Sequence, residues 1–154
     1  MRFKTWIGVF VAVLSAFETI TFAYQKVDIP GIKPKSKNEK PFQVEFMTPE
    51  ELKEKIAKSE PVLVVDLRGP GAFADSDITI KGSLHSKVRR VAYRLKEFPR
   101  DKEIITYCAC PADEAAVLGA QSLLGSGFKR VRVLKGGWQA WLKAGGQLQP
   151  KPKV

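Results

Sequence analysis

Residues 104–125 read IITYCACPADEAAVLGAQSLLG and place an apolar run, a loop and a helix in direct succession. The run IITY is typical of a buried strand, and the helical pattern of residues 114–127 ends in glycines, as many helices do. Both cysteines of the chain, Cys108 and Cys110, lie in the loop between the two. Because α/β sheets bind ligands at the carboxyl ends of their strands, this loop is the first candidate for a functional site.

Short apolar strands and helices alternate on both sides of this segment, which predicts an α/β domain with a mostly parallel sheet. Thr48, Pro49 and Glu51 form a capping box that starts a helix running to about Lys58. An amphipathic helix is expected over residues 88–98, before Pro99, and a loop that can include one helical turn over 69–77. The other expected elements are strands at 42–46, 62–65, 82–86 and 131–134, and a short helix within 136–146.

The length of 154 residues favours one domain, and 44% hydrophobic residues suffice for a core. The net charge of +10 could suggest nucleic acid, but many lysines fall in the segments 33–40 and 151–153, which have the composition of tails. No RNA-binding or helix-turn-helix signature is present in the sequence. We therefore expect a basic, solvated surface and no nucleic-acid partner.

The N-terminus has two basic residues, an apolar run and then small residues ending at Ala23. This order predicts a signal peptide over residues 1–23, or an uncleaved anchor, and thus a periplasmic or secreted protein that touches a membrane only through this segment. Residues 24–41 have the composition of an extended linker. The folded domain is expected over residues 42–147, followed by a disordered tail over 148–154.

Cys108 lies where a thiol can become reactive. Asp113 is a good N-cap candidate, and the free amides at the start of the next helix favour a thiolate, so we expect the pKa of Cys108 to fall below about 8.5. An inert buried thiol is the alternative. A disulfide between Cys108 and Cys110 would close a very small, strained ring, so redox chemistry explains that spacing better than stability does.

Three segments then stand in order: VVDLRGPGAFADSDITIKGS at 64–83, YCACPADEAAVLGAQSLLGSGF at 107–128 and VRVLKGGWQAW at 131–141. The first is similar to the opening Asp-x-Arg pattern of single-domain rhodaneses, the second to their active loop and following helix, and the third to their closing Leu-x-Gly-Gly-x-x-Ala-Trp signature. The chain resembles this sulfurtransferase family from about Thr48 to Gly146, with a variant Cys-Ala-Cys-Pro loop. The resemblance implies a five-stranded, mostly parallel sheet with helices on both faces.

The resemblance also implies a mechanism. Cys108 would take the outer sulfur of a donor such as thiosulfate as a persulfide and pass it to a thiol or cyanide acceptor. Asp66 and Arg68 would support the loop, through hydrogen bonds and an ion pair respectively. No cofactor or metal is implied, and we expect a monomer. Backbone amides of the active loop would surround the persulfide, the loop residues being Ala109, Cys110, Pro111, Ala112 and Asp113.

Two residues depart from the usual family pattern. Asp113, followed by Glu114, replaces a basic residue at the end of the loop, and carboxylates there oppose a thiolate. Cys110 is a possible resolving thiol that could attack a persulfide on Cys108. A cysteine phosphatase is excluded because the arginine it needs is replaced by Glu114. Compensating cations could come from Arg68, Lys81, Lys87, Arg89 or Arg90.

Three functions therefore stay open: a sulfurtransferase, a catalytically weak binding or sulfur-carrier module, and a thiol–disulfide redox protein that uses Cys108 and Cys110. We expect His85 at the surface and a tight turn at Gly136 and Gly137. Trp138 and Trp141 are expected to pack in the core.

Overall fold

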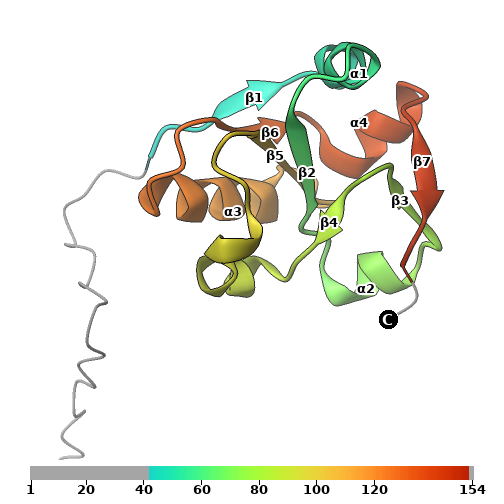
Figure 1. Ribbon diagram of the computed structural model, residues 1–154. Helices are drawn as coiled ribbons and strands as arrows, with labels where there is room; N and C mark the ends of the chain where they lie inside the picture. Colours follow the sequence, from blue (N-terminus) through green and yellow to red (C-terminus); the bar gives the residue numbers. More distant parts are fainter. Residues whose placement is uncertain (1–41, 153–154) are drawn as a thin grey trace, which may run out of the picture. The chain divides into compact units, whose positions relative to one another are not determined.

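The computed structural model describes residues 42–152 (Figure 1). The expected signal peptide or anchor (1–23) and linker (24–41) lie outside the described residues. Between residues 42 and 152, no helix combines the length and the apolar character needed to cross a membrane.

A five-stranded parallel sheet forms the centre of the domain, in the order β1-β6-β5-β2-β4. Its central strands are mostly buried, as parallel strands covered on both faces should be. The predicted α/β fold with a five-stranded parallel sheet is therefore confirmed. The strands are β1 Glu45–Met47, β2 Val62–Asp66, β4 Leu84–His85, β5 Glu103–Tyr107 and β6 Val131–Leu134.

Helices cover both faces of this sheet (Figure 1). One apolar cluster forms beneath α3 (Glu114–Gly125), which contributes Ala116, Ala120 and Leu123. The cluster on the other face receives Leu52 from α1 (Pro49–Ala57), and Trp138 and Trp141 from α4 (Gly137–Lys143). The expected core positions of both tryptophans are confirmed.

The start of α1 follows its sequence closely. The Thr48 hydroxyl oxygen accepts a hydrogen bond from the Glu51 amide at 3.2 Å, and Pro49 occupies the first turn. The prediction of this helix is confirmed, since a cap is a local interaction between residues three positions apart.

The expected amphipathic α-helix over residues 88–98 is wrong in type. The segment forms two 3₁₀ helices, η1 (Val88–Tyr93) and η2 (Leu95–Glu97). Arg94 lies between the two helices, and its guanidinium donates to Glu97 and to the carbonyl oxygen of His85. Apolar residues at i and i+3 suit a 3₁₀ helix as well as an α-helix, so the spacing could not distinguish them.

The helical turn allowed for residues 69–77 is present as the short helix α2 (Pro70–Ala74), which has a proline in its first turn. The C-terminal segment is more ordered than expected. The disordered tail predicted for 148–154 is wrong for β7 (Leu148–Pro150), which pairs antiparallel with β3 (Ile78–Ile80) (Figure 1). Leu148 lies opposite buried Ile80 and packs against the apolar cluster beneath α1 and α4. These contacts hold β7 in place.

Candidate active site

Cys108 directly follows β5, at the carboxyl edge of the sheet, and the loop Cys108–Asp113 leads into α3. Neighbouring main chain fixes this edge on both sides. The Leu67 amide donates to the Tyr107 carbonyl oxygen at 2.8 Å, and the Trp138 amide donates to the Cys108 carbonyl oxygen at 2.8 Å. The backbone that carries the Cys108 thiol is therefore held by β2 and by the start of α4.

The Cys108 side chain is fully buried in the cluster beneath α3, with 0% of the residue exposed. The Cys110 amide donates to its sulfur at 3.3 Å. The other expected amides are not all available, because Pro111 has no N–H group and the Asp113 amide donates to the Cys110 carbonyl oxygen instead. The expected ring of loop amides from Ala109 to Asp113 is therefore incomplete.

The pKa of the Cys108 thiol is raised, whereas a lowered pKa was expected from the sequence. Burial, followed by the hydrogen bond with the Cys110 side chain, raises the pKa of the Cys108 thiol to about 11. Backbone hydrogen bonds from Cys110 and Ala116 lower this pKa but do not outweigh burial. The expected low pKa is wrong, because burial disfavours a charged sulfur more strongly than the nearby amides favour it.

Asp113 occupies the N-cap position of α3 but does not cap it. Its backbone is left-handed, with φ of 56°, and its side chain makes no cap hydrogen bond. One carboxylate oxygen, Oδ2, accepts from the Gly136 amide at 2.9 Å, whereas the buried Oδ1 has no hydrogen-bond partner among the described residues. The carboxylate that replaces the family's basic residue thus joins the active loop to the residue before α4.

Gly137 allows this junction to close. Its φ is +49°, and a Cβ atom added there would lie 2.2 Å from the Cys108 carbonyl oxygen. A turn was expected at Gly136 and Gly137, and both do have positive φ. The contact with the active loop restricts position 137 more strongly than the turn does. The atom in the way is the Cys108 carbonyl oxygen, and a main-chain atom cannot move aside as the end of a side chain can.

A cavity of about 510 Å³ opens beside the loop, and Cys110 and Ala115 form part of its wall. Leu67, Pro70 and Val88 make its wall largely apolar. Three exposed cationic residues from the η1 region complete the lining, namely Lys87, Arg89 and Arg90. Of the cations considered from the sequence, Lys81 does not line the cavity.

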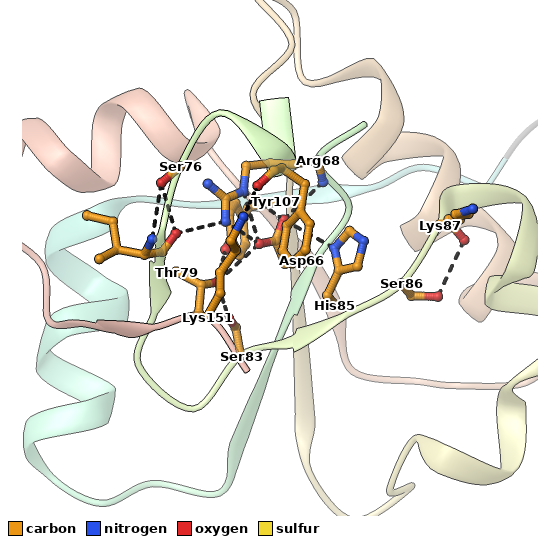
Figure 2. Close-up of polar contacts among 12 residues, drawn as sticks. Asp66, Arg68, Ser76, Thr79, Ser83, His85, Ser86, Lys87, Tyr107 and Lys151 are labelled. Carbon is orange, nitrogen blue, oxygen red and sulfur yellow. Dashed lines mark hydrogen bonds and ion pairs between the residues drawn. The ribbon is translucent and has the colours of Figure 1, made fainter. Parts of the chain in front are cut away.

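Arg68 also lines the cavity, but its charge is neutralised by a buried carboxylate. Its guanidinium pairs with Asp66, Nη2 to Oδ2 at 2.7 Å, with both side chains fully buried. The Asp66 carboxylate also accepts from the Arg68 amide at 3.0 Å and from the Thr79 hydroxyl at 3.1 Å (Figure 2). The guanidinium carbon lies 4.2 Å from the ring centre of Trp138, on the α1–α4 face. Asp66 and Arg68 therefore hold the end of β2, whereas Cys108 points into the opposite face.

Sequence reasoning missed the rest of this polar network. Thr79 and Tyr107 join their hydroxyls at 2.9 Å, and burial raises the pKa of Tyr107. His85, expected at the surface, is partly buried and stacks on Phe73 with ring centres 3.7 Å apart. Burial lowers the pKa of His85, which favours the neutral imidazole. No local sequence signal marks these contacts, because the partners are far apart in the chain.

No metal ligands gather at the site. Across residues 42–152, no group of three or more His, Cys, Asp or Glu side chains could hold a metal ion. Cys108 and Cys110 are both free thiols.

Gly137→Ala should lower the free energy of unfolding by about 1–3 kcal/mol, because the new Cβ would press on the Cys108 carbonyl and strain a left-handed backbone. Urea denaturation of the full chain measures this loss. Gly71→Ala is the matched control, since no atom lies within 4 Å of a Cβ added there. Equal stabilities for the two variants would contradict the assigned role of Gly137.

In a Cys110→Ser variant, alkylation of Cys108 by iodoacetamide should keep accelerating from about pH 7 to about pH 10.5, because only the thiolate reacts. A raised pKa moves the thiolate to higher pH, so no plateau should appear near the ordinary value of about 8.5. The same variant unfolded in urea is the control and should level off near that ordinary value. A folded-state plateau at the same pH would contradict the assignment.

Comparisons of the sequence with protein-family models and with known proteins point to the same family. The model of the rhodanese-like domain matches residues 48–144. A sulfurtransferase from Allochromatium vinosum is 31% identical over 96 residues, which cover 62% of this chain and 86% of the relative. The thiosulfate sulfurtransferase GlpE from Pseudomonas putida is 33% identical over 86 residues, covering 56% of this chain and 74% of that protein.

Solved structures agree with this result. The BH2092 protein from Bacillus halodurans superposes with a TM-score of 0.60 at 29% identity, over 69% of this chain and 77% of that one. Thiosulfate sulfurtransferase from Pseudomonas aeruginosa has a TM-score of 0.61 at 22% identity, over 71% of this chain and 21% of that one, and supports the fold alone. With a family model that spans most of the folded domain, and with the five-stranded sheet and loop described above, the chain belongs to the rhodanese-like domain family.

Proposed function

We propose that this protein is a sulfurtransferase that carries a sulfane sulfur as a persulfide on Cys108. The observation that carries the proposal is the placement of Cys108 at the carboxyl end of β5, next to a loop thiol that lines a cation-rich cavity. The sulfurtransferase relatives support the same reaction class. The donor is a small sulfur-containing anion such as thiosulfate, and the acceptor is a thiol or cyanide.

The transfer has two steps. The Cys108 thiolate attacks the outer sulfur of thiosulfate, a new S–S bond forms, and sulfite leaves with the electrons of the bond that breaks. The acceptor thiolate or cyanide then attacks the outer sulfur of the persulfide, and Cys108 leaves as a thiolate. Sulfur changes carrier, and no outside oxidant or reductant is consumed.

The charges around the cavity support an anionic donor. Lys87, Arg89 and Arg90 are exposed on its wall, and no salt bridge within residues 42–152 joins any of them to a carboxylate. Asp113 is directed to the Gly136 amide. Unpaired cations in a concave site attract small anions.

A second candidate follows from the burial of Cys108. A thiol that is fully buried and has a pKa of about 11 is mostly protonated at neutral pH. A domain in this state could hold sulfur or bind a partner with little turnover. Substantial release of sulfite from thiosulfate by the full chain, with cyanide as acceptor, would decide against this candidate.

Cys108→Ser should reduce sulfite release and thiocyanate formation to the uncatalysed level, because the covalent intermediate cannot form on a hydroxyl. Intact mass spectrometry of the thiosulfate-treated wild-type chain should show the gain of one sulfur, and the variant should show no such gain on residue 108. Gly71→Ala provides a control with the site intact. A serine variant that transfers sulfur as fast as the wild type would overturn the proposed function.

The double change Arg89→Gln and Arg90→Gln should raise the KM for thiosulfate by about three- to tenfold, because two cations leave the cavity wall. The difference from wild type should shrink in high salt, which screens exposed charges. Lys96→Gln removes a neighbouring exposed cation that does not line the cavity, and it should leave the KM unchanged. Equal KM values for all three proteins would show that these arginines do not attract the donor.

A further inference from the structure

The cavity and the Cys108 sulfur do not meet. Three residues that line the cavity also pack with the cluster that contains Cys108, namely Leu67, Cys110 and Ala115. Cys108 itself is 0% exposed and does not line the cavity. The Cys110 amide donates to the Cys108 sulfur at 3.3 Å, so the two residues are in direct contact. A donor that enters the cavity therefore encounters the Cys110 thiol before it can reach Cys108.

We propose that the Cys110 side chain is a gate, which covers the Cys108 sulfur from the cavity and must move aside before sulfur transfer begins. This role deepens the proposed function, and Cys110 acts in it as a positioning residue that forms no bond with the transferred sulfur. The gate requires a side chain of suitable size at residue 110 and does not require its sulfur to react.

The three covering residues differ in their freedom to move. Leu67 is 2% exposed, and its amide is bonded to the Tyr107 carbonyl oxygen. Its Cδ1 atom also fills the space beside Gly119, where an added Cβ would lie only 2.2 Å away. Ala115 belongs to α3 and has no side-chain torsion that moves a heavy atom.

Cys110 is the residue best able to open. It lies in the loop, is partly exposed and has one side-chain torsion, whose staggered positions point the sulfur in different directions. Pro111 follows it and restricts the Cys110 backbone, so rotation of the side chain is the easier movement. Rotation would move the Cys110 sulfur away from Cys108 and open a path from the cavity for solvent and a donor anion.

Substitutions at residue 110 distinguish a side chain that only covers Cys108 from a thiol that reacts with the transferred sulfur. Cys110→Ala shortens the cover, Cys110→Ser keeps a polar group of similar shape, and Cys110→Val keeps a bulky cover without a polar group. Each full-length variant has Cys108 as its single cysteine. Iodoacetamide alkylation measures the access and ionisation of Cys108, and persulfide formation from thiosulfate measures its use.

The gate predicts that Cys110→Ala speeds alkylation of Cys108 near pH 8 by at least about tenfold over Cys110→Ser, the difference that one pKa unit makes. The pH profile of the alanine variant should also move to lower pH. Cys110→Val should stay as slow as Cys110→Ser, and all three variants should still form the persulfide, the alanine variant fastest. Thermal unfolding of each variant checks that a faster reaction is not local unfolding.

Several outcomes would overturn the gate. Equal alkylation rates in the alanine and serine variants would show that Cys110 does not cover Cys108. A fast valine variant would assign the effect to the loss of a polar group at residue 110 and not to the loss of cover. Loss of sulfur transfer in all three variants, including serine, would make Cys110 a reacting thiol. Alkylation does not depend on sulfur transfer. A gate confirmed by alkylation in a protein that takes no sulfur from thiosulfate would therefore refute only the proposed function.

Discussion

The active loop depends on a main-chain hydrogen bond between two segments that are 30 positions apart, from the Trp138 amide to the Cys108 carbonyl oxygen at 2.8 Å. The Asp113 carboxylate adds a second link, to the Gly136 amide, and Gly137 leaves the space in which both links can form. Together they fix the loop between β5 and α3 against the start of α4. The position of the cysteine is therefore set by one main-chain hydrogen bond and one carboxylate that accepts from a main-chain amide.

The charged residues on the two faces of the sheet have different roles. On the α1–α4 face, Asp66 and Arg68 neutralise each other in a buried pair beneath Trp138. On the α3 face, exposed cations of η1 stand on the cavity wall without carboxylate partners in the described part of the chain. A buried pair keeps a strand end rigid but adds little net field, so any attraction for an anion must come from the unpaired set.

Local patterns in the sequence predicted local structure well. The Thr48 cap and the apolar run at 62–65 each determine an element through neighbouring residues, and both elements were predicted correctly. The Glu51 side chain does not complete the expected capping box, because its carboxylate accepts from Arg132. Spacing failed over 88–98, where the period suits two kinds of helix, and composition failed at Leu148, which is ordered by Ile80 far earlier in the chain. The loop was found from the sequence, but the burial of Cys108 was not, because the cluster that surrounds it includes residues far away in the chain, such as Val65, Val91 and Phe128.

Asp113 has a consequence for how this loop can vary. Its carboxylate holds the residue in front of α4, so position 113 and the glycine pair at 136 and 137 work as one unit. An arginine introduced at 113 alone would remove an anchor and leave the Gly136 amide without its acceptor, instead of simply adding a positive charge. Grafting this loop onto another scaffold would accordingly require transferring Asp113 together with Gly136 and Gly137.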